Sequence, residues 1–169
     1  MTIAKRGLKR SRNSTGMDIA FKDFNIVISI DPGTNTGLSI FDCDNKEWIM
    51  CRTMEIHKAL FVINNIMAEK EPNVNILVIV EDSRKISGGR ERLMGAGSIR
   101  RDCSIWDDFL NDKVKVYKET VLFVFISPKG NKYLKMDKEL WKQYAKWEDN
   151  KMPSEHARDS ATYIFSYIN

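Results

Sequence analysis

Apolar residues gather in short runs along the chain, and most of these runs have the length and alternation of β-strands. In residues 25–31 isoleucine fills every second position, so Val27, Ser29 and Asp31 share the opposite face. A later run is apolar on both faces, which is typical of an interior strand covered on each side. Strands are predicted at residues 25–31, 36–42, 47–56, 74–81 and 121–127.

Other segments carry apolar residues at helical spacing. Residues 57–71 place Leu60, Ile63 and Met67 on one side of a helix, and Pro72 ends it. Further helices are predicted at 136–147 and 154–168, and the segment 87–110 is expected to begin flexibly and become a helix.

The order of these elements indicates the fold class. Short turns join the first three strands, which predicts an antiparallel meander. Helices then alternate with the remaining two strands, and two helices follow. We therefore expect one α/β domain: a five-stranded mixed sheet, its first three strands antiparallel, flanked by helices.

The composition is that of a soluble globular protein. Of 169 residues, 43% are hydrophobic and 30% charged, and no apolar run approaches the roughly 18 residues of a membrane span. The N-terminus lacks the hydrophobic segment of a signal peptide, which predicts a cytoplasmic protein. Cys43, Cys51 and Cys103 are widely spaced, so neither a disulfide framework nor a cysteine zinc site is expected.

The net charge of +4 is unevenly distributed. Residues 1–16 hold five lysines and arginines and no acid, so the rest of the chain is close to neutral. We expect residues 1–22 to form a basic flexible arm ahead of a single domain at 23–169. A basic arm suits contact with nucleic-acid phosphates, although a solubilising tail would carry the same charge.

Candidate chemistry lies at the ends of two predicted strands, where Asp31 ends the first and Glu81 ends the fourth. If these strands are parallel neighbours, both carboxylates emerge at the sheet edge where open sheets bind ligands. On the last predicted helix, which Ser154 is expected to cap, His156 and Asp159 are three residues apart and face one way. Each residue alone has an ordinary explanation: a turn before Pro-Gly, a solvated strand end or a surface hydrogen bond.

Together, three carboxylates and an imidazole would suit a hard cation such as magnesium or manganese. Two ions roughly 4 Å apart can hold the attacking water and the leaving oxygen in phosphodiester hydrolysis. In that arrangement Asp31 would bridge the ions, and His156 would ligate a metal or orient the water as a base. Gly33 and Gly37 are expected to let the first two strands turn closely beside Asp31.

Three segments give the chain a resemblance to a known family. They are IDPGTNTGLSIF on the first two predicted strands, LVIVED at the end of the fourth, and EHARDSATYI on the last helix. In their order and spacing, over residues 25–168, the chain resembles the RuvC-type Holliday-junction resolvases, which have a ribonuclease H-like fold. The segment GAGSIRR (95–101) is similar to a Gly- and Arg-bearing segment of that family.

The resemblance implies a metal-dependent endonuclease that resolves four-way DNA junctions by paired symmetric nicks, with other branched DNA as further candidate substrates. It implies that Asp31, Glu81, His156 and Asp159 are the catalytic, metal-binding set, holding two magnesium ions with manganese as a substitute. It also implies a homodimer packed through the helix after Glu81, where the small residues 95–97 allow close approach; packing within the chain is the alternative.

The extra arm and the basic segment after Glu81 resemble phage and virus-encoded relatives. Such an origin would place the protein in the bacterial cytosol or a host cell compartment.

Basic residues near Glu81 and in the loop around 127–135 are candidates for contact with DNA, although a solvated surface would have the same composition. Tyr133 could stack on an opened base. The candidates are Arg84, Lys85, Arg90, Arg92, Arg100, Arg101, Lys129, Lys132 and Tyr133. By contrast, the helical spacing of Trp141, Tyr144 and Trp147 favours a place in the core.

Three rival functions share some of these features. Actin- and sugar-kinase-like ATPases bind nucleotide phosphate on a similar Asp-x-Gly-Thr turn, but they need two such domains and this chain has one such turn. A ribonuclease H acting on RNA–DNA hybrids would use similar chemistry. A non-catalytic junction-binding protein would gain nothing from clustered metal ligands.

Overall fold

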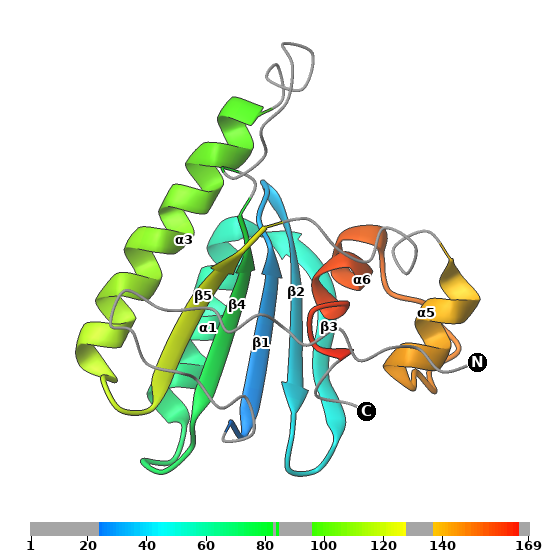
Figure 1. Cartoon of the computed structure of the whole chain (residues 1–169), viewed down its shortest axis with the longest axis horizontal. Coiled ribbons are helices and arrows are strands. Elements are labelled where there is room, and N and C mark those ends of the chain that lie inside the picture. Colours follow the sequence, from blue (N-terminus) through cyan, green and yellow to red (C-terminus); the bar gives the residue numbers. More distant parts are fainter. Residues whose placement is uncertain (1–23, 83, 85–95, 128–136, 166–169) are drawn as a thin grey trace.

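The computed structural model describes residues 24–82, 84, 96–127 and 137–165. The arm predicted at 1–22 lies outside them. In chain order the elements are β1 (Ile26–Asp31), β2 (Asn35–Asp42), β3 (Glu47–Glu55), α1 (Ile56–Glu69), β4 (Ile76–Glu81), α3 (Ala96–Val116), β5 (Val121–Ile126), α5 (Lys138–Ala145) and α6 (Glu155–Ala161) (Figure 1).

The five strands form one mixed sheet in the order β3-β2-β1-β4-β5. β2 pairs antiparallel with both β1 and β3, which confirms the predicted meander. β4 pairs parallel with β1 and with β5. β4 is therefore an interior strand, which explains why its sequence is apolar on both faces.

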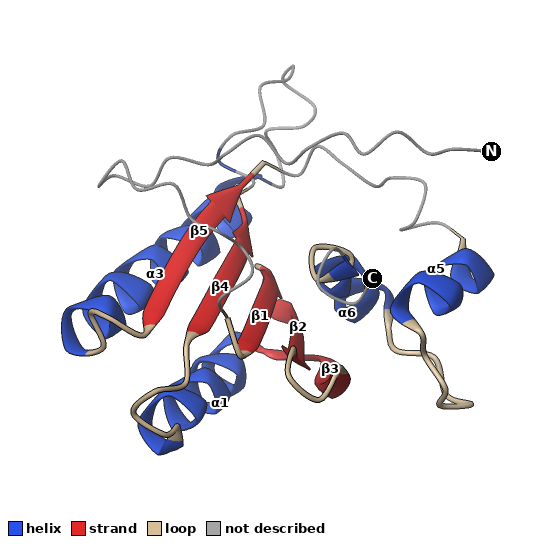
Figure 2. Ribbon diagram, turned by 60° about the horizontal axis from the view of Figure 1, so that its bottom comes forward, coloured by secondary structure: helices blue, strands red, loops and turns tan. Residues whose placement is uncertain are grey.

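Helices cover both faces of the sheet (Figure 2). On one face α1 and α3 pack through Ile63 and Trp106 in a buried cluster that includes Ile28. On the other face α5 and α6 contribute Trp141 and Ala161 to a second buried cluster. The alternation along β1 thus separates two cores, and Asp31 belongs to the face that carries α6. Within the described ranges, no helix combines the length and the apolar character that crossing a membrane requires.

The last helix is shorter than the sequence predicts, because α6 ends at Ala161 and not near residue 168. The hydroxyl of Thr162 donates to the carbonyl of Asp159 at 2.7 Å. In a continued helix that carbonyl would accept from the amide of Tyr163, which donates instead to Ser160 at 3.3 Å. Competition from a threonine hydroxyl and a tighter turn therefore close the helix early.

Candidate functional site

Two carboxylates meet at the carboxyl edge of the parallel pair β1 and β4. Ile30 is paired with Val80, so the next residues, Asp31 and Glu81, stand side by side. Because side chains alternate along a strand, both point to the face on which α6 lies. The condition for a shared edge, that the two strands are parallel neighbours, is met.

Helix α6 lies close to β2 because small residues face each other across the contact. A Cβ atom on Gly37 would overlap the backbone carbonyl of His156. Beside it, the hydroxyl of Ser39 donates to the carbonyl of Ala157 at 3.0 Å and pairs with the hydroxyl of Ser160 at 2.7 Å. Gly37 pairs with Asp31 across β1 and β2, as a close turn beside that acid requires, and its missing side chain also makes room for the helix.

This docking brings an imidazole from α6 to the first strand-end acid. His156 Nδ1 lies 3.2 Å from Asp31 Oδ2, although the two residues are 125 positions apart in the sequence. The histidine side chain is 59% exposed and the aspartate side chain 18% exposed. The carboxylate therefore orients an imidazole that still faces solvent, where it can meet a substrate.

The second strand-end acid has a partner that the sequence analysis missed. The hydroxyl of Tyr163 donates to Glu81 Oε2 at 2.6 Å. Burial, then the hydrogen bond and charge of Glu81, and then the charges of Asp31 and Asp159 raise the pKa of Tyr163 well above its usual range. The phenol thus keeps its proton and donates. The i, i+3, i+7 spacing of His156, Asp159 and Tyr163 was the available signal.

The charges of three carboxylates act on this phenol, and Glu81 contacts it directly, but among the described residues the acids form no closed metal cage. Across the part of the chain that the structure describes, no three histidine, cysteine, aspartate or glutamate side chains are grouped so that they could hold an ion. Asp31 faces His156, and Glu81 faces Tyr163. The donor types, three carboxylates and one imidazole, nevertheless fit a hard divalent cation.

One predicted DNA contact is held within the protein. The guanidinium of Arg84 binds Asp82 at 2.8 Å and Asp107 on α3 at 2.9 Å, and it lies 4.7 Å from the ring centre of Phe125. Hydrogen bonding to Asp82 is the main cause that raises the pKa of Arg84. This arginine ties the chain just after Glu81 to α3, and its contact with DNA stays a prediction.

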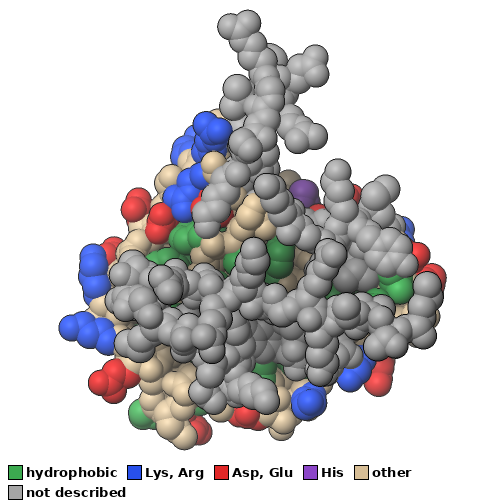
Figure 3. Space-filling model, in the orientation of Figure 1, with side chains coloured by type: hydrophobic (Ala, Val, Ile, Leu, Met, Phe, Trp, Pro, Cys, Tyr) green, Lys and Arg blue, Asp and Glu red, His purple; other side chains and the backbone are tan. Residues whose placement is uncertain are grey.

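Other predicted basic contacts lie on the N-terminal half of α3, where Figure 3 shows Lys and Arg side chains at the surface. Arg100 is exposed, and the side chain of Arg101 is 71% exposed with its Nε 3.8 Å from Asp102. A Cβ on Gly97 would meet nothing within 4 Å. The remaining candidates lie outside the described residues: Lys85, Arg90, Arg92, Lys129, Lys132 and Tyr133.

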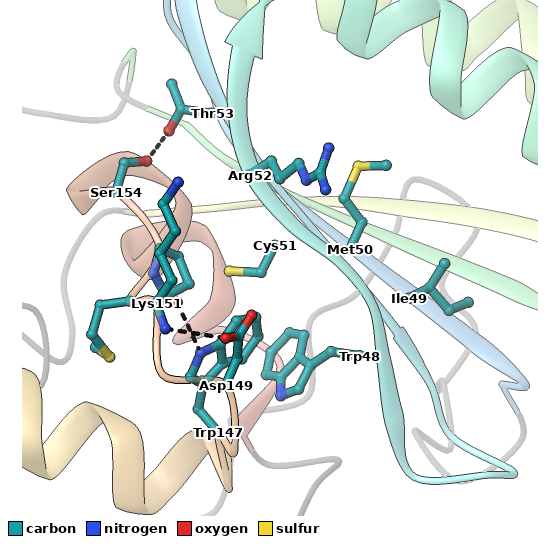
Figure 4. Close-up of a pocket in the computed structure, with 12 residues that line it drawn as sticks. Trp48, Ile49, Met50, Cys51, Arg52, Thr53, Trp147, Asp149, Lys151 and Ser154 are labelled. Atoms are coloured by element: carbon teal, nitrogen blue, oxygen red, sulfur yellow. Dashed lines mark hydrogen bonds between the residues drawn. The ribbon is translucent and has the colours of Figure 1, made fainter.

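A groove of about 630 Å³ runs beside the candidate site, between the edge strand β3 and the segment 147–154 (Figure 4). Trp48 and Trp147 contribute to its lining. The hydroxyls of Thr53 and Ser154 pair across it. Ser154 was expected to cap α6, but its side chain makes no capping bond and joins β3 instead. The groove thus ends two residues before His156.

Comparisons with known proteins support the architecture. No protein-family model matches the sequence, and no curated protein matches it. A solved structure, T. thermophilus RuvC in complex with a Holliday junction substrate, is similar with a TM-score of 0.52 and 10% sequence identity. The similarity covers 83% of this chain and 91% of that chain. The five-stranded mixed sheet with its flanking helices is therefore the ribonuclease H-like fold of RuvC.

Proposed function

We propose that this protein is a metal-dependent endonuclease that cuts branched DNA, with the four-way junction as its principal substrate. The observation that carries the proposal is the meeting of Asp31 and Glu81 at one sheet edge, opposite His156 on α6. Support also comes from the fold, which is shared with a RuvC structure bound to a Holliday junction substrate.

In this proposal Asp31, Glu81 and Asp159 would hold magnesium, with manganese as a substitute. His156 would either complete this ligand set or leave Nε2 free to act as a base. Bound divalent ions would lower the pKa of a water molecule and offset the charge that develops at the phosphate.

The chain's own groups would orient and move a proton. With the proton on Nδ1, His156 donates to Asp31 Oδ2 and presents Nε2 as an acceptor. The exposed ring can then take a proton from the water that attacks a phosphodiester. Asp31 holds the ring in the orientation that this transfer requires.

The proposal includes a homodimer that packs through α3 and places two such sites on opposed strands, which would produce paired nicks. Open space around Gly97 supports approach of a second copy at this helix. Arg100 and Arg101, both exposed on α3, would contact the phosphates of the arms.

The test is cleavage of a synthetic four-way junction with magnesium, manganese or EDTA, beside linear duplex and an RNA–DNA hybrid. We expect paired symmetric nicks that need a metal. Asp31→Asn should slow cleavage by more than about 100-fold. Losing a residue that only supports a metal ligand costs up to about 100-fold, and losing the ligand itself should cost more. Junction binding should persist or tighten, because the substitution removes a negative charge near the phosphate.

Asp44→Asn is the matched control, because Asp44 is an exposed acid in the β2–β3 turn. This variant should cut at the wild-type rate. Wild-type cleavage by Asp31→Asn would show that the active site lies elsewhere. Cutting confined to the hybrid would assign a ribonuclease H instead, and binding without any cut would leave a junction-binding protein.

A further inference from the structure

Tyr163 makes a short contact with one of the two strand-end acids. Its hydroxyl lies 2.6 Å from Glu81 Oε2, in the range of a charge-assisted O–H···O⁻ hydrogen bond. The two residues are 82 positions apart, so the bond joins the turn after α6 to the end of β4. Only the folded arrangement of sheet and helix brings them together.

The contact completes a pattern of two pairs between the same elements. His156 contacts Asp31 from the first turn of α6, and Tyr163 contacts Glu81 from just beyond its end. Because Asp31 and Glu81 are neighbours across β1 and β4, one C-terminal segment orients both acids.

The ring and the hydroxyl of Tyr163 have separable roles. The ring is partly buried against the hydrophobic cluster that contains Ile164 and Phe165. The hydroxyl leaves that cluster to reach Glu81. A phenylalanine at this position would keep the ring packing and lose the hydrogen bond to Glu81, so the two roles can be tested separately.

We propose that Tyr163 is a positioning residue of the site, whose hydroxyl holds the Glu81 carboxylate in the orientation that binds a divalent cation beside Asp31. The inference rests on the proposed function. Groups that hydrogen-bond to a metal-binding carboxylate commonly fix its orientation in this way. Without the hydroxyl, Glu81 gains rotamers that point away from Asp31. Cation binding is then weaker, because it must supply the entropy cost of ordering this side chain.

The test measures Mn²⁺ binding to the full-length, DNA-free protein by calorimetry, with the fold checked by circular dichroism. Tyr163→Phe should raise the dissociation constant by about 10-fold or more, while the melting temperature changes little. Tyr144→Phe is the matched control, because it removes the hydroxyl of a partly buried tyrosine of the same core that stacks on Phe165. Its Mn²⁺ affinity should equal that of the wild type.

A double-mutant cycle separates action through Glu81 from any other effect of the tyrosine. Glu81→Gln should weaken Mn²⁺ binding, and adding Tyr163→Phe should weaken it no further. If the double variant shows a further loss equal to that of Tyr163→Phe alone, the inference is overturned. It is also overturned if Tyr163→Phe alone binds Mn²⁺ with wild-type affinity, or if its weaker binding is explained by unfolding of the protein.

Asp31→Asn distinguishes this inference from the proposed function. If Asp31→Asn leaves Mn²⁺ binding unchanged, the acids do not hold the metal and the proposed function fails. If Asp31→Asn weakens binding and Tyr163→Phe does not, only the role of Tyr163 fails.

Discussion

At the scale of single residues, the contact between Gly37 and α6 is the most restrictive feature of the site. The strand and the helix backbone approach so closely that no side chain fits at position 37. The same helix carries His156, whose ring must reach Asp31. A methyl group on the strand would therefore move the His156 ring away from Asp31 as well as strain the core.

We predict that Gly37→Ala destabilises the protein by at least ~2 kcal/mol, because the added Cβ overlaps the carbonyl of His156 and helix or strand must shift. Urea unfolding measures the change in the free energy of unfolding. Gly33→Ala is the control: its Cβ would lie 3.4 Å from Asn35 O, an ordinary contact, and should cost less than about 0.5 kcal/mol. Equal losses in the two variants would refute the close contact.

Residue patterns predicted part of the site and could not predict the rest. Strand ends and helical spacing follow from local sequence, so Asp31, Glu81 and His156 were identifiable as candidates. The partner of Glu81 was missed: the spacing of Tyr163 from His156 indicates a shared helix face, but it does not reveal a bond across 82 residues to Glu81. The contact of Gly37 with α6 was not predictable either, because glycine suits a turn and a close approach alike and only the packing of α6 reveals the second.

At the scale of elements, alternation and order were sufficient to predict the five strands and the mixed sheet, while helix ends depended on details. The early end of α6 coincides with the bond from the Thr162 hydroxyl and with a tighter turn of backbone bonds after it. Similarly, the chain after β4 read as a basic segment, yet Arg84 is held between Asp82 and Asp107. Charge along a sequence does not tell whether a cation faces solvent or an acid in the same fold.

An arginine held between acids, such as Arg84, and an exposed arginine, such as Arg101, should respond differently to substitution. Arg84→Gln removes the guanidinium that binds Asp82, whose side chain is 4% exposed, and Asp107, so we expect a loss of about 2–4 kcal/mol in unfolding free energy. Arg101→Gln, at an exposed position on α3, should leave stability unchanged and reduce the slope of log affinity for junction DNA against log salt by about 1. Denaturation and binding titrations measure both. The reverse outcome would make Arg84 the DNA contact.

At the scale of the whole molecule, charge is divided between a basic N-terminal stretch and a nearly neutral remainder. Five cations and no acids in residues 1–16 exceed the net charge of the entire chain. A long-range attraction for DNA would therefore come mainly from this stretch, and the domain would supply the geometry of cutting.

Replacing the five cations of residues 1–16 by glutamine should weaken junction binding at low salt. If they bind duplex phosphates, the slope of log affinity against log salt should flatten by up to about 4.5, which is about 0.9 for each phosphate that is no longer neutralised. The full-length variant keeps the chain length, so it is a better comparison than a truncation. An unchanged slope would leave the stretch as a solubilising tail, and the rate of cleavage with saturating enzyme should not change.

The docking of α6 on β2 also sets the order of events in folding. The bonds from Ser39 to Ala157 and Ser160 close loops of 118 and 121 residues, whereas β1 and β2 pair across a short turn. Contacts between distant segments cost more chain entropy and tend to form late. We therefore expect the strand-end acids to be assembled before the helix that completes the site arrives. Any activity of this site begins only when the fold is finished.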